Sequence, residues 1–77
     1  MPTLHRLRSS KVCMYADDHE PPHFHLLGAG WSGVIDLDTL AIRRGTIPQR
    51  DYLEAIAWAK GNGLFLLSEW KRLNERD

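Results

Sequence analysis

The first part of the chain, up to about Thr46, alternates short apolar runs with polar turns, a pattern typical of β-strands. The predicted strands cover residues 12–15, 23–27, 31–37 and 40–44. The connections between them are too short to hold a crossover helix, so neighbouring strands must be antiparallel. In residues 31–37, alternation places Trp31, Ile35 and Leu37 on one face of the sheet.

From about Pro48 onward, apolar residues recur at helical spacing. Thr46 and Gln49 match a helix start in which a threonine and a glutamine three residues later cap the first turn. This helix is predicted to reach about Lys60. Its predicted apolar stripe is Leu53, Ile56 and Ala57.

The residues Gly61-Asn62-Gly63 interrupt the helical pattern, because glycine is unfavourable inside a helix. A second helix is predicted from about Leu64 to Glu75. Its apolar positions, at a spacing of three and four residues, are Leu66, Trp70 and Leu73.

These elements together predict an α+β fold: a small antiparallel sheet of three to four strands followed by two C-terminal helices packed on one face. A chain of 77 residues has room for one modest core. We therefore expect a single domain over residues 1–77, with strands over about 1–46 and helices over about 48–76.

Composition narrows the class of protein. Ten basic and ten acidic residues cancel, which argues against a protein that coats nucleic acid or an anionic membrane. The single cysteine, Cys13, excludes an intramolecular disulfide framework. No apolar run is long enough to span a membrane, and no apolar segment follows the basic N-terminus as it would in a secretory signal. We expect a cytoplasmic protein.

One short segment concentrates candidate chemistry. The predicted functional cluster consists of Asp17, Asp18, His19, His23 and His25. If His23 and His25 lie on a strand, their side chains project from the same face. Together with a loop imidazole or carboxylate they could supply three ligands to a divalent transition metal such as Zn, Mn, Fe or Ni. His19, His23 and His25 are the predicted ligands.

Two other interpretations of this cluster stay open. The histidines could form the solvated face of a half-buried strand, with the acids as neighbours. Alternatively, a histidine pair beside Asp17 and Asp18 could act as general acid and base without a metal, as in a metal-free nuclease.

Basic residues occur in two places and are a weaker candidate for phosphate contacts. They could instead protect a solvated strand edge. If the sheet brings the two places together, they would form a small basic patch. The residues concerned are Arg6, Arg8, Lys11, Arg43 and Arg44.

Around the histidines the sequence resembles the bacterial family named domain of unknown function 4160. The resemblance rests on Met1-Pro2-Thr3, Met14-Tyr15 and above all the run from Asp18 to His25, and it extends over nearly the whole chain. Glu20 replaces the usual Asn, and Leu26 replaces the usual Val. The resemblance implies a gene neighbour from the family named domain of unknown function 2442, in a layout similar to a toxin–antitoxin pair.

Two functions follow as hypotheses. In the first, the protein is one component of a two-protein toxin–antitoxin-like module that acts by protein–protein interaction and on RNA. Its partner would be the small protein of the domain of unknown function 2442 family, and the small size and spare tryptophans also favour a homodimer. In the second, it is a small metal-binding protein or a metal-dependent hydrolase or nuclease that uses His19, His23 and His25.

Overall fold

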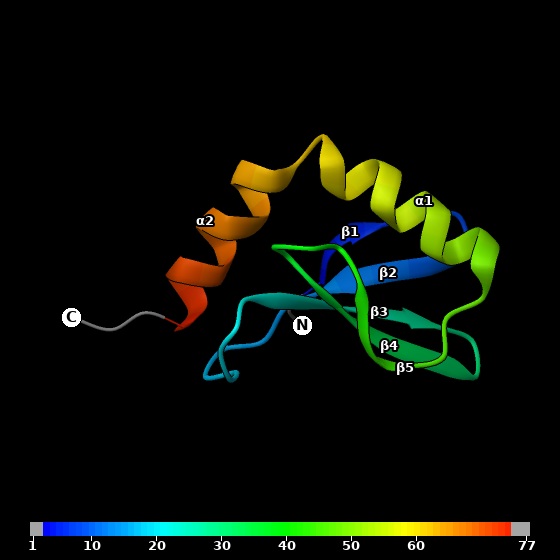
Figure 1. Cartoon of the computed structure of the whole chain (residues 1–77), viewed down its shortest axis with the longest axis horizontal. Coiled ribbons are helices and arrows are strands. Elements are labelled where there is room, and N and C mark those ends of the chain that lie inside the picture. Colours follow the sequence, from blue (N-terminus) through cyan, green and yellow to red (C-terminus); the bar gives the residue numbers. More distant parts are fainter. Residues whose placement is uncertain (1–2, 75–77) are drawn as a thin grey trace.

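The computed structural model describes residues 3–74. Five strands precede two helices along the chain (Figure 1). The elements are β1 (Thr3–Arg6), β2 (Ser10–Cys13), β3 (His23–Gly28), β4 (Trp31–Asp36), β5 (Ile42–Gly45), α1 (Gln49–Lys60) and α2 (Gly63–Asn74). The α+β class is confirmed. The end of the second helix predicted near Glu75 and the Met1-Pro2 part of the resemblance lie outside the described residues.

The sheet has five strands rather than the predicted three to four. Its spatial order, β1-β2-β3-β4-β5, follows the chain, and each neighbouring pair is antiparallel. The additional strand is β1, which contains Arg6 and forms an edge of the sheet. Because an edge strand is half solvated and mostly polar, its own sequence lacks the apolar alternation that marks the others.

Both helices lie on the same side of the sheet (Figure 1). Alternate strand residues point toward them, as expected from the two-residue period of a strand. The core on this side contains Val12, Phe24, Leu26 and Ile35 from the sheet segment and Ala55, Ala59, Leu66 and Trp70 from the helices. We call the opposite side the open face. It is defined by the intervening register positions Lys11, Cys13, His25, Leu27, Val34 and Arg44.

Of the predicted buried stripe of α1, Ile56 packs against the core, whereas the prediction is wrong for Leu53 and Ala57, which are exposed. Leu53 is 55% exposed, whereas the buried residues of the helix are Asp51, Ala55 and Ala59. The two alanines on the inner face belong to the hydrophobic core. Asp51 is tolerated in the interior because its carboxylate accepts a hydrogen bond of 2.5 Å from the Ser9 hydroxyl.

The predicted cap of α1 is also absent, because Pro48 occupies the N-cap and no side chain bonds the first turn.

The break between the helices and the inner face of α2 are as predicted. Gly61 and Asn62 separate the helices, and both Leu66 and Trp70 are fully buried. Leu73 packs against the core from a partly buried position.

Candidate metal centre

The centre is built on the first residues of β3. His23 and His25 are two positions apart and project from the same side of the strand, as predicted. Phe24, between them, points the other way and is fully buried in the core. This alternation fixes the two imidazoles side by side, with ring centroids 5.3 Å apart. The His23 ring also packs against Trp70, at a centroid distance of 5.0 Å, and is only 4% exposed.

The carboxylate of Asp18 joins the two imidazoles. Its Oδ2 atom lies 2.9 Å from His23 Nε2 and 3.0 Å from His25 Nε2. Ligand atoms from these three residues all lie within 4.8 Å of one another. Two nitrogens and one oxygen therefore converge on one point at the side of the sheet.

Two groups contact Nδ1 of the His23 ring. The Pro21 carbonyl lies 2.9 Å from this atom and can only accept, whereas Arg43 Nη1 lies 3.3 Å away and can only donate. The Arg43 contact fits the tautomer with hydrogen on Nε2, which donates to the Asp18 carboxylate. The Pro21 contact fits the tautomer with hydrogen on Nδ1, which leaves the Nε2 lone pair available to a metal ion.

Asn74, at the end of α2, holds the loop that carries Asp18. Its Oδ1 accepts a hydrogen bond of 2.6 Å from the Asp18 backbone N–H. Its Nδ2 donates to the carbonyls of Tyr15 and Trp70, each at 3.2 Å. A second contact from the same helix joins the Trp70 indole N–H to the Glu20 carboxylate at 3.4 Å. The loop is therefore attached to a helix that lies far away in the sequence.

The surroundings of Asp18 favour its charged form. Burial by itself raises the pKa of the carboxyl, but hydrogen bonds from His25, from the His19 backbone N–H and from His23 outweigh burial and lower the pKa. Asp18 is therefore an anionic ligand at neutral pH. The nearby Tyr15 packs edge-on against His25 at 4.7 Å, and burial, followed by the charges of Cys13 and Asp18, raises the pKa of its hydroxyl.

A cavity of about 110 Å³ opens beside the cluster, and it is lined by two arginines of β5. Pairing between β4 and β5 shifts register between Val34 and Ile35, so Arg43 is the extra residue beside Arg44. A bulge of this kind allows successive side chains to reach one side of a sheet. Arg43 pairs with Asp36 and donates to the Pro21 carbonyl at 3.2 Å. The cavity therefore has the ligand cluster and the positively charged Arg43 and Arg44 in its lining.

The remaining predicted members of the cluster are placed differently. Asp17 and His19 are both exposed, and neither belongs to the converging group of ligand atoms. The backbone N–H of His19 donates to Asp18 Oδ1 at 3.1 Å, and its side chain lines the same cavity. The structure therefore brings together Asp18, His23 and His25 and leaves His19 at the rim.

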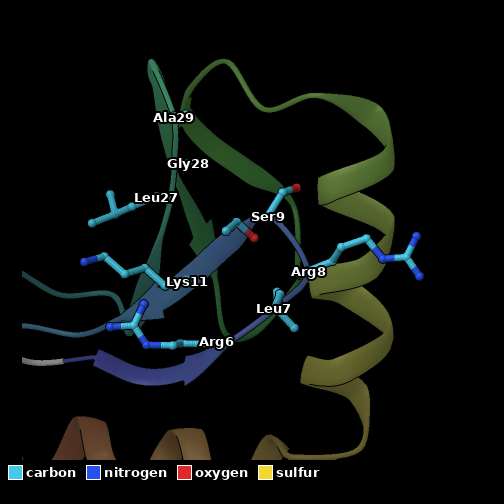
Figure 2. Close-up of a pocket in the computed structure, with 9 residues that line it drawn as sticks. Arg6, Leu7, Arg8, Ser9, Lys11, Leu27, Gly28 and Ala29 are labelled. Atoms are coloured by element: carbon cyan, nitrogen blue, oxygen red, sulfur yellow. The ribbon is translucent and has the colours of Figure 1, made fainter.

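The five predicted basic contacts do not form one continuous patch. Arg43 and Arg44 lie beside the metal-ligand cluster. Arg6 and Lys11 are cross-strand partners, and their side chains extend together with Leu27 around a second cavity of about 330 Å³ (Figure 2). The side chain of Arg8 extends on the other side, past α1, and its backbone N–H donates to Glu54 (Figure 2).

Neither Asn74 nor the Pro21 carbonyl could be identified from the sequence. A lone asparagine near the end of a helix carries no signal for a contact with a loop 56 positions earlier. The proline pair did indicate a stiff turn, but a backbone acceptor leaves no trace in the residue type.

Comparisons with known proteins give a family and no activity. Neither helix among residues 3–74 has the length and apolar character needed to cross a bilayer. No curated protein matches the chain, and no solved structure matches it. A family model does match, and it covers residues 10–71, which include the whole of the Asp18, His23 and His25 cluster. The chain therefore belongs to the family described as Domain of unknown function (DUF4160).

Proposed function

We propose that this protein binds one divalent transition-metal ion through His23 Nε2, His25 Nε2 and the Asp18 carboxylate. The observation that supports this proposal is the convergence of these three ligand atoms on one point. Two imidazoles and a carboxylate form a donor set that suits Zn, Mn, Fe or Ni.

The distances are compatible with coordination. Metal bonds to imidazole nitrogen and carboxylate oxygen are about 2.0–2.2 Å, so two ligands at a right angle lie about 3 Å apart. The distances from Asp18 Oδ2 to the two Nε2 atoms are 2.9 and 3.0 Å. Asn74 holds the backbone of Asp18, so rotation of the Asp18 side chain is what adjusts the carboxylate to an ion.

The neighbours of the histidines also support coordination. Metal-binding histidines commonly donate their other ring N–H to a carbonyl or carboxylate, which fixes the tautomer and the ring orientation. The Pro21 carbonyl is placed to do this for His23. Three protein ligands leave coordination positions open, the arrangement of catalytic rather than closed structural sites. Hydrolysis is the chemistry that such an ion would supply, which makes a metal-dependent hydrolase or nuclease the matching activity.

Metal analysis of tag-free protein tests the proposal, combined with thermal unfolding in EDTA and with each metal. We expect one ion per chain and a higher Tm with at least one of Zn, Mn, Fe or Ni. His25→Ala and Asp18→Ala should abolish the gain. His19→Ala is the matched control, because this histidine lies on the same loop outside the converging group, and it should keep the gain. Wild-type protein that binds none of these metals would refute the proposal.

A second candidate function, interaction with a protein partner, is favoured by the outer side of α2. Leu64, Phe65 and Leu67 are 86%, 43% and 38% exposed, which is unusual for neighbouring large apolar residues. The tryptophans do not provide this surface, since Trp70 is buried and the others are partly buried. The proposed occupant is the small protein of the domain of unknown function 2442 family that the resemblance implies, in a toxin–antitoxin-like module.

Co-expression and size-exclusion chromatography test this second candidate. We expect the two proteins to co-elute, and Leu64→Ser in α2 to separate them. Leu53→Ser is the control, because Leu53 is an exposed leucine of α1, outside the α2 surface. Separate elution of the wild-type proteins contradicts the candidate, and elution of this chain alone as a dimer would assign the α2 surface to a second copy instead.

A further inference from the structure

We propose that the open face of the sheet binds the phosphate backbone of a single-stranded nucleic acid. Three cations of different strands carry the proposal: Arg6 of β1, Lys11 of β2 and Arg44 of β5. The inference goes beyond the proposed metal centre and does not depend on an ion.

The register of the sheet places these cations on one side. Lys11 pairs with Arg6 on one neighbouring strand and with Leu27 on the other. Leu27 is two positions from His25 on β3, so both side chains point to the same side. His25 in turn pairs with Val34 of β4, which pairs with Arg44 of β5. The three cations therefore lie on the face that the helices leave uncovered.

The charge of this face is not neutralised by the protein itself. Within residues 3–74, no ion pair or side-chain hydrogen bond engages Arg6, Lys11 or Arg44. Two acids beside this face are compensated, because Asp18 contacts two imidazoles and Asp36 pairs with Arg43. A chain of zero net charge thus has a locally positive sheet face.

The spacing of the cations favours a polymer over a single phosphate. Strands in a sheet lie about 4.8 Å apart, so β2 and β5 are separated by about 14 Å. One phosphate group cannot contact both Lys11 and Arg44, whereas a chain with a phosphate on every residue can. Each end of the path is also hollowed, with a cavity of about 330 Å³ at Arg6 and Lys11 (Figure 2) and one of about 110 Å³ at Arg44.

The centre of the face favours a single strand over a duplex. Leu27, Val34 and the His25 ring lie between the cations and are partly exposed. Unpaired bases can pack against apolar and aromatic side chains on a sheet, as they do in sheet-based RNA-binding modules. The bases of a duplex are stacked inside the helix and cannot make these contacts.

Fluorescence anisotropy with a labelled 12-nucleotide single-stranded RNA tests the proposal. EDTA is present throughout, so the result is independent of metal binding. With three phosphate contacts, the logarithm of the affinity should fall with the logarithm of salt concentration with a slope of about −2. This slope corresponds to about 20-fold weaker binding at 200 mM than at 50 mM salt.

Matched variants locate the binding surface. Arg6→Gln, Lys11→Gln and Arg44→Gln should each weaken binding and reduce the slope by about 0.7. Arg50→Gln removes the same charge from α1, which lies on the other side of the sheet (Figure 1) and lines neither cavity, so affinity and slope should be unchanged. No anisotropy change at 50 mM salt overturns the proposal, as does equal weakening by Arg50→Gln. Equal affinity for duplex RNA or inorganic polyphosphate overturns the assignment to single strands.

Discussion

The hydrogen bonds of Asn74 lead to a prediction that can be tested by comparing Asn74 with a second asparagine, Asn62. Each closes a helix by donating from Nδ2 to the carbonyl four residues earlier: Asn62 to Trp58 at 2.8 Å and Asn74 to Trp70 at 3.2 Å. Only Asn74 also bonds the loop, through the Asp18 N–H and the Tyr15 carbonyl. Replacing each asparagine with alanine therefore separates the loop contacts from the helix contact.

The magnitude follows from the two additional hydrogen bonds. A net contribution of about 1 kcal/mol each predicts that Asn74→Ala costs about 2 kcal/mol more than Asn62→Ala. Total stability for a chain of this length is about 4–12 kcal/mol, so the loss is a large fraction of it. In a domain of this size the difference corresponds to a Tm lower by about 8–16 °C.

Thermal and urea unfolding followed by tryptophan fluorescence measures this difference, with EDTA present to remove any contribution from metal. Metal affinity provides a second measurement, because Asn74 holds the backbone of a proposed ligand. A lost outer contact typically weakens metal binding about 10–100-fold, and we expect this for Asn74→Ala only. Equal stability and equal metal affinity in the two variants would refute the assignment of Asn74 as the residue that holds the loop.

Three further predictions concern the fold and its pH dependence. In urea unfolding, Leu66→Ala should lower the free energy of unfolding by about 2–5 kcal/mol, because this side chain is fully buried. Leu64→Ala should change it by less than about 0.5 kcal/mol, because Leu64 is exposed. Similar losses in the two variants would contradict the described core. Gly45→Ala should lower the free energy of unfolding far more than Gly30→Ala. Both residues have a positive φ, which should cost Gly30→Ala about 1–2 kcal/mol, but only at Gly45 would an added Cβ also collide with neighbouring backbone. Folding lowers the pKa of Asp18, so its contribution to the free energy of unfolding is present above the ordinary pKa of 3.8 and is lost as pH falls through the lowered pKa. In EDTA, Asp18→Asn should therefore reduce the loss of stability in acid. The same loss of stability in acid for the variant and the wild type would contradict this.

The histidine pair could be predicted from sequence because it depends only on local geometry. Two residues separated by one position on a strand share a face whatever the rest of the chain does. The partner of the pair could not be predicted in the same way. Asp17, Asp18 and His19 are adjacent and chemically suitable, and the choice of Asp18 depends on a contact with Asn74, 56 positions away.

The helices show the same division between local and distant causes. Their existence and the break at Gly61 follow from residue preferences along the chain. The inner face of α1 does not, because Leu53 is the more apolar candidate and yet is exposed. Burial of Asp51 is favoured by Ser9, a residue of the β1–β2 turn that a helical periodicity cannot take into account.

The sheet order has a consequence for the way in which the centre assembles during folding. Every strand pairs with its neighbour in the chain, so the sheet requires only short loop closures, which favour rapid folding. The β3–β4 hairpin alone aligns His23 and His25, whereas Asp18 is held in place only after α2 has closed a loop of 56 residues. We therefore expect the imidazole pair to form early and the carboxylate to join it late. High-affinity metal binding would then be a kinetic marker for the docking of the C-terminal helix.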